Sequence, residues 1–259
     1  MQRDPENKES KTLQQFADFS GKQALEVGCG EGRLTWKYAK LAARVVAFDV
    51  DHDALRVAQA DALINSSQHV LFFNASAKHI PLKRHSFDIV VGGLALCCID
   101  DKDKIDALSE IQRILKPNGA FIDLRALESN WQVEIQDAQQ YQLAGRLNDT
   151  PEGLAHEEGA NQALREVEAK GWYIKEKEAV FDLFYYWDTP SEMKEFIENE
   201  WRDFRSVSED VYRKTNSLWV LAGAEARVRV RVRMLITKWS SGKIRTKRME
   251  INNENQNFT

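Results

Sequence analysis

The sequence predicts an α/β protein with a doubly wound, mostly parallel sheet, and two observations carry this prediction. Apolar segments of strand length alternate with longer segments of helical periodicity between residues 23 and 124, which is typical of parallel strands joined by right-handed crossovers. A glycine-rich turn follows the first of these strands, where residues 24–33 read ALEVGCGEGR. A chain of 259 residues is long enough for one sizeable domain of this class with an inserted cap.

The first half of the chain contains the clearer elements. Apolar, β-branched and aromatic runs predict strands at 23–28, 44–50, 69–75, 87–92 and 119–124. Helical periodicity between them predicts helices at 32–42, 52–65 and 103–115.

The strict alternation lapses after Arg125. We expect loop and helix over 126–160, a helix at 161–170, a long strand at 172–187, a helix at 190–204 and a strand at 227–239. The residues between the last two strands, 188–226, are too many for a hairpin and predict a cap. The polar, Asn-rich segment 243–259 predicts a disordered tail.

The glycine turn and the strand after it have the composition of a nucleoside site. Gly28 and Gly30 let the backbone approach a ligand closely, and a helix that begins at such a turn favours an anionic group. Asp49 ends the next strand, 21 residues after Gly28, where a carboxylate can accept two hydrogen bonds from a ribose diol. The third glycine of the dinucleotide fingerprint would fall at Arg33, so the spacing disfavours a nicotinamide cofactor.

Four segments in order resemble the motifs of the class I S-adenosylmethionine-dependent methyltransferases. The glycine turn resembles the family's V-L-E-V-G-C-G-x-G, and Asp49 matches the acid that ends the second strand. The other three segments are NASAKHIPL at 74–82, SFDIVV at 86–91 and EIQRILKPNG at 110–119. They resemble G-D-A-x-x-L-P-F, S-F-D-x-V and E-x-x-R-V-L-K-P-G-G, and together they cover 23–125.

The resemblance implies S-adenosylmethionine as cofactor, S-adenosylhomocysteine as product, and a role for each matching residue. Glu26 would act on the ammonium group, Gly28 and Gly30 would lie against the methionine part, and Asp49 would hold the ribose. Ser76, where the family often has Asp, and the backbone of Ala77 would bind the adenine. Gly92 would lie beside the sulfonium, together with Gly93 and Leu94.

The resemblance also implies a seven-stranded sheet whose last strand is antiparallel, with a helical cap insertion. Residues 1–125 would form the cofactor-binding half of one Rossmann-like domain, and 126–242 the rest of the sheet with insertions near 126–160 and 188–226. We expect the cap to cover an acceptor pocket lined by the aromatic residues of 184–187 and by Trp201.

The acceptor is expected to be a small molecule methylated on O, N or C, because the chain has none of the motifs of amine- or cytosine-methylating relatives. The closest likeness is to the quinone-biosynthesis group. No catalytic base is recognisable: His79, His85 and His156 are candidates by residue type alone. Two alternatives remain, a non-catalytic protein that binds S-adenosylmethionine and a nicotinamide-dependent oxidoreductase.

Composition limits the other possibilities. A net charge of −4 gives no support to nucleic-acid binding, and no apolar run is long enough to cross a bilayer. Three unpatterned cysteines, Cys97 and Cys98 among them, fit a reducing cytoplasm and predict no metal site. Arginines alternate along 227–233. We expect them either to form salt bridges with acidic residues of the neighbouring strand or to bind an anionic acceptor. The sequence leaves the oligomeric state open.

Overall fold

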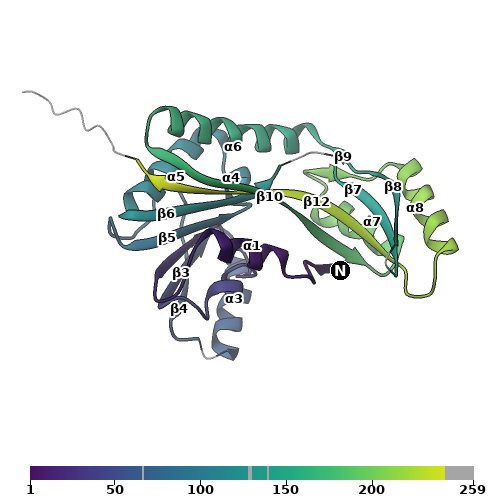
Figure 1. Cartoon of the computed structure of the whole chain (residues 1–259), viewed down its shortest axis with the longest axis horizontal. Helices are drawn as coiled ribbons and strands as arrows, with labels where there is room; N and C mark the ends of the chain where they lie inside the picture. Colours follow the sequence, from purple (N-terminus) through teal and green to yellow (C-terminus); the bar gives the residue numbers. More distant parts are fainter. Residues whose placement is uncertain (66, 128–129, 139, 243–259) are drawn as a thin grey trace, which may run out of the picture.

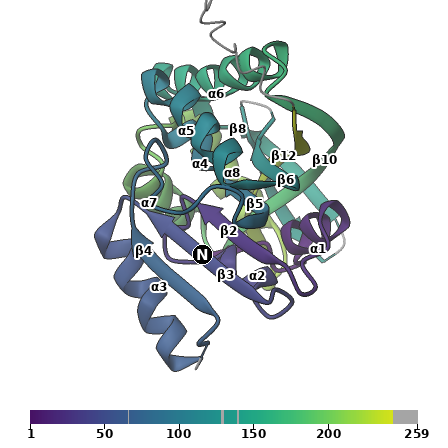
Figure 2. The same ribbon diagram turned by 90° about the vertical axis from the view of Figure 1, so that its left-hand side faces the viewer.

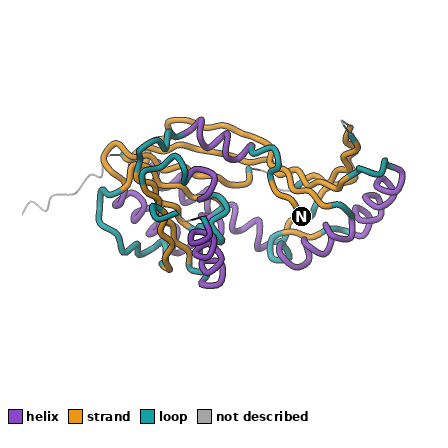
Figure 3. The backbone as a smooth tube through the Cα atoms, turned by 90° about the horizontal axis from the view of Figure 1, so that it is seen from below, coloured by secondary structure: helices purple, strands orange, loops and turns teal. Residues whose placement is uncertain are grey.

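The computed structural model describes residues 1–65, 67–127, 130–138 and 140–242, so the predicted tail at 243–259 lies outside the described residues. The molecule is elongated and has two lobes (Figure 1). One lobe holds the parallel strands with their flanking helices. The other is built on the far ends of two long strands, and the tube view separates the two lobes clearly (Figure 3).

The main sheet has the order β1-β10-β12-β6-β5-β2-β3-β4. Strands β2 to β6 pair in parallel, and β12 is antiparallel to both β6 and β10. The predicted mostly parallel sheet with an antiparallel last strand is therefore confirmed. The expected count of seven strands was wrong, since the sheet has ten strands within the described residues. The strands are β1 (Gln2–Arg3), β2 (Gln23–Val27), β3 (Arg44–Asp49), β4 (Val70–Asn74), β5 (Phe87–Gly93), β6 (Leu115–Ala126), β10 (Tyr173–Trp187) and β12 (Arg227–Ser241).

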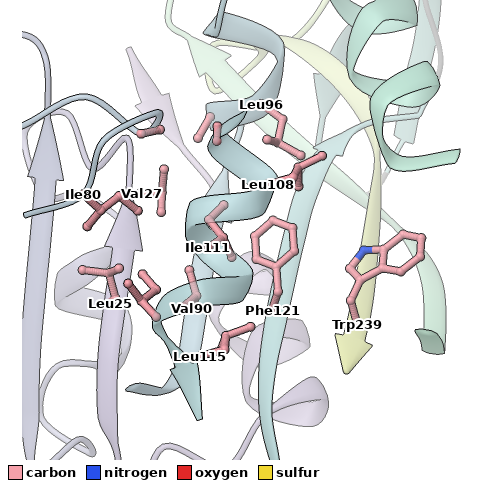
Figure 4. Packing of buried hydrophobic residues seen from close by; sticks show 14 of the residues in the cluster. Leu25, Val27, Ile80, Val90, Leu96, Leu108, Ile111, Leu115, Phe121 and Trp239 are labelled. Carbon is pink, nitrogen blue, oxygen red and sulfur yellow. The ribbon is translucent and has the colours of Figure 1, made fainter. Parts of the chain in front are cut away.

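Helices cover both faces of this sheet (Figure 2). The helices α5 (Asp101–Ile114) and α6 (Pro151–Ala169) pack on one face, and α1 (Lys8–Phe16), α2 (Thr35–Tyr38) and α3 (His52–Ile64) pack on the other. Alternate residues of each strand point to opposite faces, so Leu25 and Val90 join the α5 side while Ala24 and Ile89 join the α1 side. Figure 4 shows the α5 side, where Leu108 and Ile111 contact the sheet around Phe121.

The second lobe continues the sheet beyond the carboxyl ends of the parallel strands. The first half of β12 pairs with β7 (Gln132–Asp137), which forms a hairpin with β8 (Gln140–Arg146). The helices α7 (Pro190–Glu200) and α8 (Glu209–Leu221) pack on this extension, and β9 (Asn148–Asp149) pairs with β11 (Arg205–Ser206). The cap is thus continuous with the sheet rather than a purely helical insertion.

Three sequence expectations were wrong in their boundaries. Residues 132–137 and 140–146 form the hairpin strands in place of the expected loop and helix, since Val133 and Ile135 alternate into the cap core. The helix expected at 161–170 begins ten residues earlier at Pro151, because the Thr150 hydroxyl accepts from Gly153 N at 3.0 Å and caps it. The helix expected at 32–42 is one turn, Thr35–Tyr38, between tight turns.

Candidate functional site

The glycine turn lies at the carboxyl end of β2 and adopts the backbone conformation that its sequence predicts. Gly28 has φ +67°, a left-handed conformation that L side chains rarely adopt. A Cβ at this position would also lie 2.8 Å from the Cβ of Ala95 in the short helix α4 (Ala95–Cys98). The turn and α4 therefore fit together only because residue 28 has no side chain.

Asp49 fixes the turn from the neighbouring strand. Its Oδ2 accepts a hydrogen bond from Gly30 N at 2.7 Å, and its Oδ1 accepts one from Asp51 N at 3.0 Å. Each oxygen keeps a further lone pair for a ligand. Asp49 thus joins the end of β3 to the glycine turn and remains at the wall of a cavity.

This first cavity has a volume of about 430 Å³, within the range of about 300–1,000 Å³ that is usual for small-molecule sites. It lies at the carboxyl ends of the parallel strands, where ligands bind in open α/β sheets. Segments that are distant in sequence line it: Val27, Gly28, Phe48, Asp49, Val50, Ala75, Ser76, Ala77, Lys78, Leu94, Ala95, Cys98, Ile99, Asp100 and Asp103.

Four of the seven residues predicted from sequence line the first cavity: Gly28, Asp49, Ser76 and Ala77. Gly30 is not part of the lining, but its N–H group is held by Asp49.

Glu26 and Gly92 lie behind the wall of the first cavity. Glu26 is 2% exposed, and one of its carboxyl oxygens accepts from Thr35 Oγ1 and from Tyr38 OH, both at 2.7 Å. Burial raises the pKa of Glu26 to about 7, against the lowering effect of the two hydroxyl hydrogen bonds. A Cβ on Gly92 would meet the ring of Phe121 at 3.4 Å, so Gly92 allows close packing under α4.

Arg33, which stands where a dinucleotide site has its third glycine, points to the N-terminal helix. Its guanidinium group pairs with Glu9 on α1, and Glu9 also pairs with Arg3 at 3.2 Å. Burial opposes ionisation of Glu9, but the two guanidinium groups hold its pKa below the ordinary value. One buried carboxylate therefore ties the N-terminal segment to the glycine turn.

A second cavity of about 200 Å³ adjoins the first and shares Leu94 and Cys98 with it. Its lining combines residues of the cap lobe with residues of α4, β6 and the N-terminal segment. They are Arg3, Leu94, Cys97, Cys98, Arg125, Ala126, Trp131, Gly153, His156, Glu157, Ala160, Tyr185, Trp201, Phe204 and Arg205.

Tyr185 and Trp201, two of the aromatic residues expected to line an acceptor pocket, line this cavity. The neighbours Phe184, Tyr186 and Trp187 do not line it, since side chains alternate along β10 and Trp187 belongs to the cap core. Sequence reasoning missed Arg3, Trp131, Phe204 and Arg205. Only the topology brings these residues together, because they come from three separate segments.

Two cysteine thiols form part of the wall between the cavities. The Sγ atoms of Cys97 and Cys98 are 3.9 Å apart, and both thiols donate to the carbonyl of Leu94. The hydrogen bond between the thiols lowers the pKa of Cys98 to about 7, against a raising effect of burial. Among the described residues, no group of three or more His, Cys, Asp or Glu residues is arranged to hold a metal ion.

The arginines of 227–233 do not line either cavity. Arg227 pairs with Asp188 at 3.0 Å, Arg229 pairs with Glu134 at 2.6 Å, and Arg231 lies 3.9 Å from Asp182. Arg229 is 6% exposed and also stacks on Tyr141 and Phe184. The structure therefore favours salt bridges between these arginines and nearby acidic residues over binding of an anionic acceptor.

The comparisons with known proteins agree with this geometry. Residues 24–119 match the family model described as a methyltransferase domain. This chain carries a class I methyltransferase domain. S-adenosylmethionine is the cofactor of that class. In the part of the chain that the structure describes, no helix is long and apolar enough to cross a membrane.

Curated relatives match only part of the chain. A demethylmenaquinone methyltransferase of Lactococcus lactis subsp. lactis is 28% identical over 116 residues, 44% of this chain and 45% of the relative. The ubiquinone/menaquinone biosynthesis C-methyltransferase UbiE of Hahella chejuensis is 32% identical over 117 residues, 44% of this chain and 46% of the relative. The matches thus span less than half the length of these relatives.

Solved structures match over both lobes. A candidate methyltransferase of Bacillus halodurans aligns with a TM-score of 0.56 at 19% identity, covering 92% of this chain and all of that one. The [4+2]-cyclase SpnF aligns with a TM-score of 0.53 at 14% identity, covering 92% of this chain and 81% of that one. These likenesses show the fold alone, and the fold is shared by a protein named for a different reaction.

Proposed function

We propose that this protein transfers a methyl group from S-adenosylmethionine, bound in the first cavity, to a small-molecule acceptor. The observation that carries the proposal is the convergence of the motif segments. The glycine turn, the end of β3, residues 75–78 and α4 contribute to one cavity, although they are spread over 72 residues from Val27 to Cys98.

The donor groups of the first cavity suit this cofactor. Asp49 would accept the ribose hydroxyls, and Ser76 with the backbone of Ala77 would bind the adenine. Lys78 is held by Asp103 at 2.8 Å, so its ammonium group is neutralised at the rim. Val27, Phe48 and Ala77 offer apolar surface to the nucleoside.

Methyl transfer needs positioning more than acid–base help from the protein. When bound, S-adenosylmethionine supplies a methyl group on an electrophilic sulfonium. Leu94 and Cys98 lie where the two cavities meet, so they would separate cofactor from acceptor and restrict entry of water. The names of the relatives support a quinone-type acceptor methylated on carbon as the first candidate to test.

Calorimetry with S-adenosylmethionine, S-adenosylhomocysteine and NAD tests the proposal. We expect both sulfur ligands to bind and NAD not to bind, because Arg33 and its partner Glu9 replace the third glycine of a dinucleotide turn. Transfer of labelled methyl to reduced demethylmenaquinone would then distinguish an enzyme from a non-catalytic binding protein. Binding of NAD alone would favour the oxidoreductase.

A further inference from the structure

Aromatic side chains form one wall of the second cavity, where the acceptor would bind if the proposed function holds. Trp131 and Trp201 meet edge to face with ring centroids 5.2 Å apart, and Tyr185 meets Trp201 in the same way at 4.8 Å. Phe204 adds a further ring next to His156, at 6.1 Å. Rings at right angles offer both faces and edges, which suits a flat aromatic ligand.

The size of the cavity limits that ligand. Its volume of about 200 Å³ is below the range of about 300–1,000 Å³ that is usual for drug-sized ligands. The part of the acceptor that enters is therefore compact, such as one ring or two fused rings.

One histidine faces this cavity. Of the five histidines, all in the described part of the chain, only His156 lines either cavity. His69 and His85 instead form hydrogen bonds to the backbone oxygens of Ala39 and Leu115. His156 lies in the second turn of α6, a 19-residue helix, so its ring is carried by a rigid element.

The arginine and glutamate side chains of the cavity are already paired. Arg205 bonds Glu157 at 2.5 Å and lies 3.1 Å from Asp149, so these three charges hold one another. Arg125 pairs with Asp123 at 3.0 Å. Arg3 shares its partner Glu9 with Arg33 and keeps a buried Nε without a hydrogen-bond partner.

We propose that the second cavity binds a planar aromatic hydroxyl compound and that His156 is the base that takes its hydroxyl proton. The O–H bond breaks, its electron pair stays on oxygen, and the proton forms an N–H bond on the neutral imidazole. The resulting aryl oxide is nucleophilic at oxygen and at the ring carbons conjugated with it. The imidazolium ion returns the proton to water.

The charged and titratable groups around His156 come from every neighbouring element. They are Asp101 on α5, Glu157 on α6, Arg205 on β11, Arg125 on β6, Arg3 on β1, Tyr185 on β10, and Cys97 and Cys98 on α4. The test therefore compares the variants with one another at each pH. The neighbouring groups are the same in every variant, so their titration does not contribute to the difference between variants.

The experiment uses 4-nitrophenol, whose oxide absorbs visible light, and its methyl ether 4-nitroanisole, which has no proton to lose. The full chain, H156Q and the control H52Q are saturated with S-adenosylhomocysteine and titrated with each probe between about pH 5 and 8. His52 is exposed on α3 and lines neither cavity, so it controls for the same chemical change.

We expect the full chain and H52Q to bind 4-nitrophenol as its oxide at pH values where the free probe is still protonated. H156Q should bind the oxide about tenfold more weakly, because Gln cannot take the proton and its neutral amide replaces the charge-assisted hydrogen bond of the imidazolium ion. All three proteins should bind 4-nitroanisole alike.

Two results would overturn this inference while leaving the proposed function intact: S-adenosylhomocysteine binds but 4-nitrophenol does not, or H156Q ionises the probe as the full chain does. Failure of S-adenosylhomocysteine itself to bind would remove the proposed function and this inference with it.

Discussion

Two carboxyl groups on adjacent strands have opposite environments. Asp49, at the end of β3, accepts two backbone N–H hydrogen bonds and faces the first cavity. Glu26, one strand away on β2, is buried between the hydroxyl groups of Thr35 and Tyr38. Burial outweighs the two hydroxyl hydrogen bonds and raises the pKa of Glu26 to about 7, which favours its carboxylic acid form. The pair therefore divides into a residue that faces the first cavity and a buried residue that supports the turn.

Replacement of Asp49 by Ala should weaken the binding of S-adenosylhomocysteine at least about tenfold. The variant loses the acceptors for the ribose hydroxyls, and hydrogen bonds to a charged group are worth about 1.5–3 kcal/mol each. It also frees Gly30 N from its partner. Calorimetry measures the change, with the exposed Asp53→Ala as control. An unchanged dissociation constant would remove Asp49 from the proposed site.

Replacement of Glu26 by Gln should flatten the dependence of stability on pH. The pKa of Glu26 is about 7 in the fold and 4.5 ordinarily, so between these values the folded chain keeps a proton that the unfolded chain has lost. Stability therefore falls as pH rises through this window, by about 3 kcal/mol in total. A Gln side chain keeps an oxygen for Thr35 and Tyr38 but cannot ionise.

Urea denaturation at several pH values between about 4 and 8 measures this effect. The full chain should lose more stability than Glu26→Gln as pH rises, and the exposed Glu31→Gln should behave like the full chain. Parallel curves for the full chain and Glu26→Gln would show that the buried carboxyl does not hold its proton.

At the scale of elements, the sequence predicted what depends on local periodicity. The strands β2 to β6 were predictable because short buried runs alternate with helices. The hairpin β7–β8 was not, since its outward residues include Tyr141 and Leu143, which blur the alternation of apolar and polar positions. The pairing of Arg33 with Glu9 joins residues 24 positions apart, and no local pattern signals it.

The start of α6 shows how tertiary contact overrides a local signal. Gly153 and Gly159 are poor helix formers, yet both lie within α6. A Cβ on Gly153 would lie 2.7 Å from the backbone oxygen of Phe204, and one on Gly159 would lie 2.1 Å from the carboxylate of Asp101. These glycines allow neighbouring segments to approach the helix closely. From the sequence alone, the same glycines indicate only a low helix propensity.

These two glycines should respond differently to substitution by Ala. Gly153→Ala should destabilise the fold by about 1–3 kcal/mol, because the obstructing atom belongs to the backbone. Gly159→Ala should cost little or gain up to about 1 kcal/mol, because the exposed Asp101 side chain can rotate away and Ala favours the helix. Urea denaturation measures both. Equal changes in the free energy of unfolding would mean that α6 is packed less tightly at Gly153 than its contacts indicate.

At the scale of the whole molecule, the long strands β10 and β12 run through both lobes. Their pairing continues from Tyr173 and Ser241 in the first lobe to Trp187 and Val228 in the second. The cap is therefore anchored by sheet hydrogen bonds over its full length rather than by a flexible linker. The sequence predicted that 188–226 form a cap, but the fixed position of the cap follows from the extended sheet.

The two lobes should separate cofactor binding from acceptor binding. Residues 188–226 contribute Trp201, Phe204 and Arg205 to the second cavity and nothing to the first. Replacing them by an Asn-Gly turn between the paired residues Trp187 and Val228 should keep the affinity for S-adenosylhomocysteine within about threefold and abolish binding of 4-nitroanisole. Because this deletion exposes the cap core, Trp201→Leu provides a milder variant with the same expected separation. Calorimetry with both ligands measures it. If Trp201→Leu folds, no longer binds S-adenosylhomocysteine and still binds 4-nitroanisole, the assignment of the two cavities is reversed.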